Sequence, residues 1–434
     1  MSKAPQKIGL LVSTALVVGN MIGSGIFVLP AALASYGSIS LLGWIFTAMG
    51  ALILAKIFSN FSKIVVGKNG GPYAYARAGF GDFIGFLVAW GYWISIWVTN
   101  GAIAIAIVSA LSFFFPELQT TPLYSISLGL AFIWFFTWIN SLGIKESGNI
   151  QLLTTLLKLL PLLFVIVVGA FYFDSANFPS FNETDQSTFT SLSAVATLTL
   201  FAFLGLESAT IPATHVENPE KTIPKATLMG TLITTCIYIL GTVVLFGVLP
   251  MEVFINSPAP FAEAAKILGG DFAGYLVAAG VAIAAIGALN GWILIMGQVP
   301  MASAKDHLFP KLFKKENKKG VPVIGLIIGS LLSSWVMLMN YTEGLVKQFE
   351  FMVLLTTLCC LIPYLFTAAS YVLVRLERKL GLAKRIKTIL LGTLGFAYAL
   401  WAIYGSGSDT VFYGFLLLLL GVPFYVFMKI YNKK

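Results

Sequence analysis

Glycine and serine stand in the middle of the first hydrophobic segment of the chain. The stretch "VVGNMIGSGIFVLP" (residues 17–30) lies inside an apolar run from Ile8 to about Ser35. Glycine in a helix costs roughly 1 kcal/mol relative to alanine, and a backbone amide without a partner in hydrocarbon costs more. An interrupted helix therefore needs protein or a water-filled cavity to supply partners. Close helix packing through Gly19-x-x-x-Gly23 is the alternative explanation.

A second hydrophobic segment is interrupted at a comparable position. In "VATLTLFAFLGLESATIPATHV", Gly205 lies near the middle, Glu207 follows, and Pro212 removes a backbone donor. Interrupted helices at matching positions in two halves are typical of transporter sites at a repeat interface. The amide end of a half-helix attracts an anion, and a free carbonyl end accepts hydrogen bonds from an amine. The pattern predicts a binding site for an α-amino acid.

The residues of the two interruptions divide between the two ends of such a substrate. We expect Gly23, Ser24 and Gly25 to bind the carboxylate, and the carbonyl groups near Met21 and Phe201 to bind the amine.

Two charged residues lie well inside predicted spans: Glu207 and Lys158, the latter in "QLLTTLLKLLPLLF". Each charge would cost roughly 2.5–3.5 kcal/mol or more at mid-bilayer without a partner or water. Glu207 is predicted to be a gating or proton-carrying carboxylate, or alternatively a structural acid bonded to nearby backbone. Lys158 is predicted to occupy a cation site against the first interruption, where burial favours its neutral form and makes it a proton carrier. Snorkelling toward the cytoplasmic edge is the alternative.

Aromatic and amide side chains in two further spans could line a cavity. Trp292 follows Asn290-Gly291 in "ALNGWILIMGQ", and its ring could stack on a cationic or apolar side chain. Tyr92 and Asn100 lie about 80° apart around one helix and could face the same space. Ordinary core packing is the alternative for these residues, and for Trp292 so is a place in the aromatic belt at the membrane interface.

The composition requires a membrane around these residues. Of 434 residues, 58% are hydrophobic and 10% are charged, whereas about 25% are charged in a typical soluble protein. The sequence therefore predicts an all-α integral membrane protein that forms a single transmembrane domain over residues 1–434. No cleavable signal is apparent. We expect twelve transmembrane helices over residues 8–33, 38–62, 83–112, 123–141, 150–173, 191–213, 226–249, 272–303, 322–340, 348–374, 387–405 and 410–430.

Lysine and arginine gather in one set of loops, for example between Lys305 and Lys319, whereas the opposite loops are mostly acidic. The positive-inside rule places the basic loops and both termini in the cytoplasm, and predicts a multi-pass protein of the cytoplasmic (inner) membrane. The net charge of +9 is explained by this topology, so no nucleic-acid partner is expected.

The chain carries little that could support metal or enzyme chemistry. Cys236, Cys359 and Cys360 lie in apolar spans, and the sequence has two histidines. We therefore expect no disulfide, metal site, cofactor or catalytic residue, and no enzyme activity.

Several motifs together resemble the amino acid–polyamine–organocation (APC) superfamily, and most closely the bacterial basic amino acid/polyamine antiporters of the arginine/agmatine exchanger type. "GNMIGSGIFVLP" is similar to the first-helix motif, "GGPYAYARAGFG" to the loop after the second helix, and "FAFLGLESATIPATHVENPEKTIPKA" to the sixth helix and its loop. "GWILIMGQ" and "LIPYLFTA" correspond to helices eight and ten. The likeness covers nearly the whole chain.

The resemblance implies alternating access around helices one and six. It also implies two inverted five-helix repeats, over residues 8–173 and 191–374, and two additional helices over residues 387–430. For the substrate, the resemblance implies carboxylate binding by Ser24 and Gly25, and amine binding by the carbonyls of Met21, Phe201 and Leu204. It implies that Trp292 stacks on the substrate side chain, in a pocket that Asn100 and Thr356 also line. It further implies an outer gate formed by Tyr92, Glu207, Trp292 and Tyr364, with Phe201 as an aromatic gate.

Three positions depart from the arginine exchanger. Phe201 stands where that exchanger has tryptophan, Thr356 where it has serine, and Lys158 where it has a small apolar residue. In other branches of the superfamily, a lysine in the fifth helix stands in for the sodium ion of related transporters.

The resulting prediction is a secondary active amino acid transporter, independent of sodium, that moves cationic amino acids or their amine products by exchange or with protons. The alternatives are a proton-coupled permease for neutral amino acids and a transporter-like amino acid sensor. The expected partners are the substrate and the lipid bilayer, with protons and a second copy of the chain as further candidates.

Overall fold

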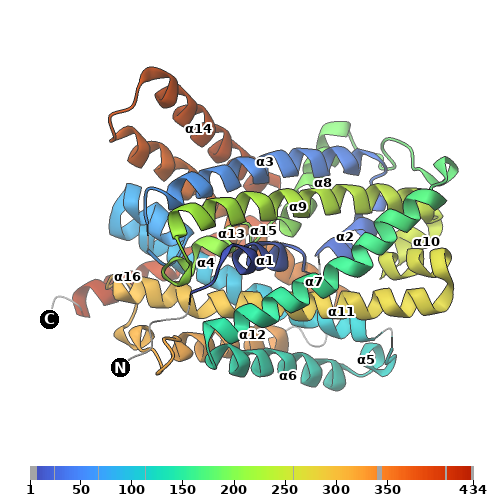
Figure 1. The fold of residues 1–434 in the computed structure, drawn as a ribbon, viewed down its shortest axis with the longest axis horizontal. Helices are drawn as coiled ribbons and strands as arrows, with labels where there is room; N and C mark the ends of the chain where they lie inside the picture. The colour runs from blue at the N-terminus through green and yellow to red at the C-terminus, as the bar shows by residue number, and fades with distance from the viewer. Residues whose placement is uncertain are drawn as a thin grey trace.

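The computed structural model describes residues 7–23, 25–66, 68–112, 114–257, 259–339, 345–405 and 408–431, and helices dominate them (Figure 1). The α-helices and 3₁₀-helices (η) are α1 (Leu10–Met21), α2 (Gly25–Ala34), α3 (Ile39–Ser62), α4 (Pro72–Leu111), α5 (Glu117–Thr120), α6 (Pro122–Ser141), α7 (Ile144–Gly169), η1 (Ala170–Tyr172), η2 (Ser175–Asn177), α8 (Thr188–Ala202), η3 (Ser208–Thr210), η4 (Ala213–His215), α9 (Pro219–Val248), α10 (Met251–Asn256), α11 (Pro260–Lys305), η5 (Lys311–Lys314), α12 (Val323–Met339), α13 (Leu345–Leu376), α14 (Leu382–Gly405), α15 (Ser408–Leu419) and α16 (Gly421–Tyr431).

Within the described chain, nine helical stretches are long and apolar enough to cross a membrane, and α1, α8 and α12 are shorter apolar helices. Each of the twelve predicted spans overlaps one of these twelve stretches. The prediction of an all-α membrane fold is therefore confirmed.

Two long helices bend at glycines that adopt left-handed backbone angles. Gly81 in α4 has φ 75° and Gly270 in α11 has φ 74°, which glycine adopts without strain. Each bend separates a short first segment from a long apolar one. The predicted spans at residues 83–112 and 272–303 begin directly after these bends.

The two interrupted segments run antiparallel, as the contacts at their ends show. At one end, the Ile8 amide donates to the His215 carbonyl (2.8 Å), and the Glu217 amide donates to the Ile8 carbonyl (2.9 Å). At the other end, the Ser38 amide donates to the Ser180 carbonyl (2.8 Å). The start of the first segment thus meets the end of the second, and the reverse. This arrangement agrees with inverted repeats, which stay a prediction.

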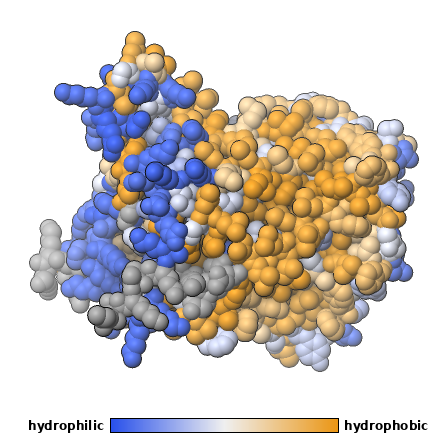
Figure 2. Space-filling view, viewed as in Figure 1, coloured by the Kyte–Doolittle hydropathy of each residue, from blue (hydrophilic) through white to orange (hydrophobic). Residues whose placement is uncertain are grey.

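Hydrophobic residues cover most of the visible surface, and hydrophilic residues gather at its left end (Figure 2). Helix α16 lies toward this end in the same view (Figure 1). Large apolar side chains such as Phe171 (85% exposed) and Leu123 (68%) lie on the outside. Such a surface is stable in lipid and would be unfavourable in water.

Candidate substrate site at the two helix interruptions

The first interruption lies between α1 and α2 and confirms the predicted break. The chain leaves helical geometry at Ile22 (φ −76°, ψ 77°), and α2 begins at Gly25. Ser24 lies outside the described residues. The last carbonyls of α1 and the first amides of α2 have no partner within their own helices. Negative and positive helix ends therefore face the same break.

Lys158 of α7 lies at the carbonyl end of α1. Its Nζ donates to the carbonyls of Gly19 (2.6 Å) and Ile22 (2.5 Å), and its side chain is fully buried. A cation is favourable there because the end of a helix carries partial negative charge. The ammonium therefore lies at the interruption and does not snorkel to the cytoplasmic edge. Its role as a proton carrier stays a prediction.

The second interruption follows α8 and touches the first. α8 ends at Ala202, and Gly205 has φ 102°. A Cβ added at Gly205 would lie 3.0 Å from the Cβ of Asn20 on α1, so both the backbone angle and the space require glycine. The Nδ2 of Asn20 donates to Ser208 Oγ at 2.8 Å. This buried contact joins the two interruptions directly.

A tyrosine that the sequence reasoning missed connects the carbonyl ends of both interrupted helices. The hydroxyl of Tyr238 on α9 lies 2.6 Å from the Met21 carbonyl and 2.8 Å from the Ala202 carbonyl. A phenol has one proton to donate, so two acceptors compete for it. The Met21 carbonyl also accepts the Gly23 amide at 2.8 Å. A tyrosine inside the apolar run "TTCIYIL" was the available signal.

The predicted residues Phe201 and Leu204 lie in the turn after α8. The Leu204 amide donates to the Phe201 carbonyl at 3.1 Å. The Phe201 ring lies against the start of α2, because a Cβ added at Gly25 would be 3.3 Å from Phe201 Cδ1. An aromatic face therefore borders the amide end of α2.

Trp292 and Asn100 approach the same region from α11 and α4. Trp292 is buried, and its Nε1 donates to the Asn20 carbonyl at 3.2 Å. Asn100 Nδ2 contacts Met296 Sδ (3.2 Å), one turn after Trp292, and Asn100 Oδ1 is buried without a described partner. Trp292 thus lies at the interruption, and Asn100 lies beside it.

Thr356 of α13 is buried next to α4. Its Oγ1 accepts a hydrogen bond from Thr99 Oγ1 at 3.3 Å. Since Thr99 precedes Asn100, these contacts place the predicted pocket residues on adjoining parts of α4, α11 and α13.

Glu207 lies between α4 and α13 and accepts hydrogen bonds from the hydroxyls of Tyr92 and Tyr364. It is fully buried, so the two hydroxyls replace water around its oxygens. Three of the predicted gate residues therefore form one cluster.

The position of this cluster shows that two of the expectations disagree, namely the outer gate and the cytoplasmic basic loops. Beyond Glu207, the Ile211 carbonyl accepts the Gly70 amide (3.0 Å), and the Thr214 amide donates to Asn69 Oδ1 (2.9 Å). The loop at residues 68–71 begins with Lys68 and follows Lys63, so it is one of the basic loops that the positive-inside rule places in the cytoplasm. Tyr92, Glu207 and Tyr364 therefore close the inner side of the interruption in that orientation. Sequence motifs alone did not show the side.

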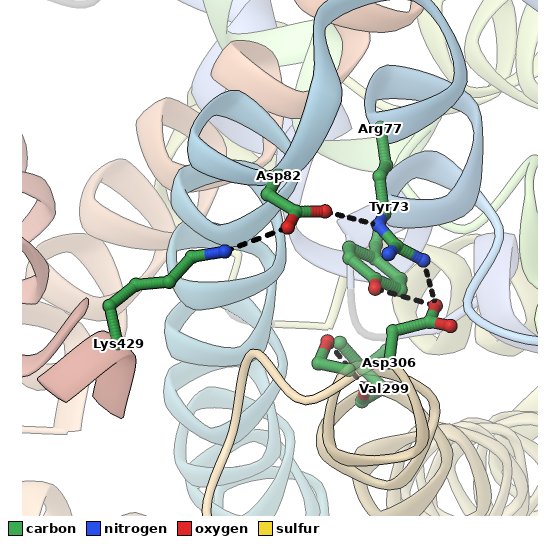
Figure 3. A network of polar contacts seen from close by, with 7 residues as sticks. Tyr73, Arg77, Asp82, Val299, Asp306 and Lys429 are labelled. Atoms are coloured by element: carbon green, nitrogen blue, oxygen red, sulfur yellow. Dashed lines mark hydrogen bonds and ion pairs between the residues drawn. The ribbon is translucent and has the colours of Figure 1, made fainter. Parts of the chain in front are cut away.

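A charged network joins α4, α11 and α16 at the basic end (Figure 3). Arg77 pairs with Asp82 (2.9 Å) and Asp306 (2.7 Å). Tyr73 donates to Asp306 at 2.8 Å, and Lys429 pairs with Asp82 at 2.8 Å. A single part-exposed ion pair contributes little to stability. Together, these contacts link the ends of α4, α11 and α16. Arg77 lies in the motif "GGPYAYARAGFG", but its two acidic partners were not predicted from the sequence.

Buried amides that were also missed pack beside the first interruption. Asn290 Nδ2 donates to Gln151 Oε1 (3.3 Å), and Asn140 Nδ2 donates to Asn290 Oδ1 (3.1 Å). A Cβ added at Gly19 would lie 1.8 Å from Gln151 Nε2. Gly19 is therefore a packing glycine, whereas Gly23 and Gly25 belong to the break.

A membrane protein with two antiparallel interrupted helices in contact has the architecture of a secondary transporter. A model of the amino acid permease family matches residues 8–423. The chain therefore belongs to the amino acid permease family, within the APC superfamily, and is a multi-pass membrane transporter and not an enzyme.

The relatives that it matches are transporters of similar length. It is 35% identical over 434 residues to the putrescine transporter PotE of Haemophilus influenzae, covering 99% of this chain and 98% of the relative. It is 34% identical to the cadaverine/lysine antiporter of Escherichia coli K12 (97% and 94% covered). It is 33% identical to the putrescine transporter PotE of the same strain (96% and 95% covered).

Proposed function

We propose that this protein exchanges a cationic amino acid for a diamine across the cytoplasmic membrane, by alternating access and without sodium. The main support for the proposal is that the carbonyl ends of α1 and α8 both lie within hydrogen-bonding distance of the Tyr238 hydroxyl, which has one proton to donate. The amide end of α2 lies across the same interruption. An ammonium group has three protons and can supply the donors that this point lacks. The relatives named for putrescine, cadaverine and lysine support this substrate class.

The two ends of the first interruption would hold the two ends of an amino acid. Amides at Ser24 and Gly25 would bind the carboxylate, and the Gly23 amide would join them once it releases the Met21 carbonyl. The carbonyl of Met21, with those of Phe201 and Leu204, binds the α-ammonium. A diamine has no carboxylate and would use the carbonyl end alone, so one site serves both substrates.

The substrate side chain would extend between α4, α11 and α13. Trp292 and Phe201 offer aromatic faces, on which a distal ammonium is favourable. Asn100 and Thr356 offer polar atoms beside them. Tyr92, Glu207 and Tyr364 then separate the bound substrate from the cytoplasm.

Lys158 would supply the positive charge that a sodium ion supplies in related transporters. Its ammonium binds two carbonyls at the end of α1, so no metal ion is needed to stabilise that end. Loss of its proton would weaken this contact and couple transport to pH.

A proton-coupled permease for neutral amino acids is the second candidate. Glu207, the only fully buried carboxylate of the described chain, already accepts two tyrosine hydroxyls. The described site therefore offers no second carboxylate to a cationic side chain.

Purified protein in liposomes separates the two candidates. Labelled lysine, ornithine, arginine, alanine and leucine are offered to liposomes loaded with putrescine, with cadaverine or with buffer. Exchange predicts that uptake of a cationic amino acid requires the internal diamine and continues without sodium. Uptake of alanine or leucine driven by a pH gradient alone would support the second candidate and contradict the first.

A further inference from the structure

A cavity lined by cationic and apolar side chains lies between α3, α13 and α14, apart from the helix interruptions. Its volume is about 500 Å³. No carboxylate is among the residues that line it, and five cations are, namely Lys56, Lys63, Arg375, Lys384 and Lys387.

These five cations have no described acidic partner. The ion pairs found in the described chain use other lysines and another arginine. Like charges gathered around one space repel one another, and the repulsion is strong where lipid and protein lower the local dielectric. An anion in the cavity would remove this repulsion.

The cations and the apolar residues are arranged by depth. On α3, Lys63 follows the last helical residue, and Lys56 lies about 10 Å deeper along the helix. On α14, Lys384 and Lys387 come first, and Leu391 and Leu394 follow on the same face. The charged part of the cavity is thus at the basic end of the bundle, and the apolar part reaches into the membrane.

The charged part of the cavity also contains hydroxyl groups, and the apolar part contains exposed leucines. Tyr371 and Thr388 line the cavity and are buried, and Asn60 Nδ2 donates to the Tyr371 hydroxyl at 3.1 Å. Leu390 and Leu394 are 57% and 45% exposed on its membrane side. The α13–α14 turn extends beyond the rest of the bundle at the upper left of Figure 1, which leaves this side open to lipid.

We propose that this cavity binds the phosphate headgroup of an anionic phospholipid, with an acyl chain along Leu390 and Leu394. Clusters of lysine and arginine between transmembrane helices on the cytoplasmic side suit lipid phosphates. Free phosphate has the same charge chemistry, but it would not use the exposed leucines. The proposal does not depend on which amine or amino acid is transported.

The test measures lipid binding to the full-length protein. Purified protein in phosphatidylcholine nanodiscs receives increasing dioleoylphosphatidylglycerol, and bound lipid is counted by native mass spectrometry alongside the melting temperature. We expect binding with a higher melting temperature. The double variant Lys56→Gln/Lys387→Gln should weaken phosphatidylglycerol binding by roughly tenfold or more.

Two matched variants decide the result. Lys318→Gln/Lys319→Gln removes two exposed lysines outside the cavity and should bind phosphatidylglycerol like the unmodified protein. Leu390→Ser/Leu394→Ser should weaken lipid binding while every cation is kept. Equal lipid binding by the Lys56/Lys387 variant would overturn the proposal. Inorganic phosphate or glycerol 3-phosphate bound as tightly as the lipid would overturn it too.

Discussion

The two helix interruptions differ in the backbone on their carboxyl-terminal sides. After the first, the chain resumes an α-helix at Gly25 that runs to Ala34. After the second, it continues through turns and the short 3₁₀-helices η3 and η4, and the next α-helix begins at Pro219. The first interruption has two helix ends, one carbonyl and one amide. The second interruption has a carbonyl end, which is followed by turns and short 3₁₀-helices and not by another α-helix.

The charges at the two interruptions also differ. Lys158 binds backbone carbonyls at the end of α1, so it stabilises a fixed helix end. Glu207 binds tyrosine side chains on α4 and α13, which can rotate away without breaking a helix. We infer that the first interruption is the stable binding element and that the second is the part that changes shape during transport.

The largest effect is expected at the contact between the interruptions. In Gly205→Val, a branched side chain would take a positive φ and meet Asn20. Backbone strain of about 1–3 kcal/mol and overpacking of similar size should reduce exchange in liposomes roughly a hundredfold. Gly381→Val is the control, because nothing lies within 4 Å of a Cβ added there. Normal exchange by Gly205→Val would show that the two interruptions need not touch.

Removal of the buried cation should have the next largest effect. Lys158→Met keeps the volume and deletes two charged hydrogen bonds, each worth about 1.5–3 kcal/mol. We expect exchange to fall about tenfold and its dependence on pH to flatten, while far-ultraviolet circular dichroism still shows a helical protein. Lys225→Met, at an exposed position, should leave both rate and pH profile unchanged. A pH profile that survives in Lys158→Met would exclude this lysine as the proton carrier.

At the second interruption, Glu207→Gln should slow exchange by several-fold to about tenfold and leave substrate affinity nearly unchanged. The amide keeps one acceptor oxygen but presents N–H donors to the other tyrosine. Tyr92→Phe and Tyr364→Phe should each have a smaller effect, and each should add little to Glu207→Gln because the three act together. Calorimetric binding and exchange rates are compared for each variant. Fully additive effects would show that the three residues do not form one gate.

The sequence was sufficient for the fold and for both interruptions. Gly23, Gly25 and Gly205 make helix unfavourable at their positions. The apolar runs around them are long enough to cross a membrane. These signals are local, so one sequence carries them. The charges Lys158 and Glu207 were identifiable for the same reason, since any charge in an apolar span needs a partner.

The partners of these residues could not be found locally. Tyr238 lies 217 positions from Met21 along the chain, and Asp306 contacts Arg77 only through the packing of α4 on α11. The depth of the Glu207 cluster also depends on distant contacts, because it is set by how the loop at residues 68–71 meets residues 211–214. Helix periodicity shows which residues share one face of a helix, but it does not show which other helix packs against that face.

The smallest expected effect concerns Tyr238. Its hydroxyl either competes with the substrate amine for the carbonyls of Met21 and Ala202, or is itself part of the amine-binding site. Tyr238→Phe removes the one proton that the carbonyls of Met21 and Ala202 share. The Ala202 carbonyl then loses the hydroxyl and the Met21 carbonyl keeps only the Gly23 amide, which should lower the free energy of unfolding by about 1–3 kcal/mol. If the substrate ammonium displaces this hydroxyl, the variant should bind lysine or putrescine severalfold more tightly, because nothing has to be displaced. Calorimetry on the purified variant measures this, with Tyr398→Phe, which loses only a long bond to the Thr47 carbonyl (3.5 Å), as the control. Weaker binding would mean that the hydroxyl itself holds the substrate, and the carbonyl ends of the two interruptions would then act through Tyr238 and not directly on the amine.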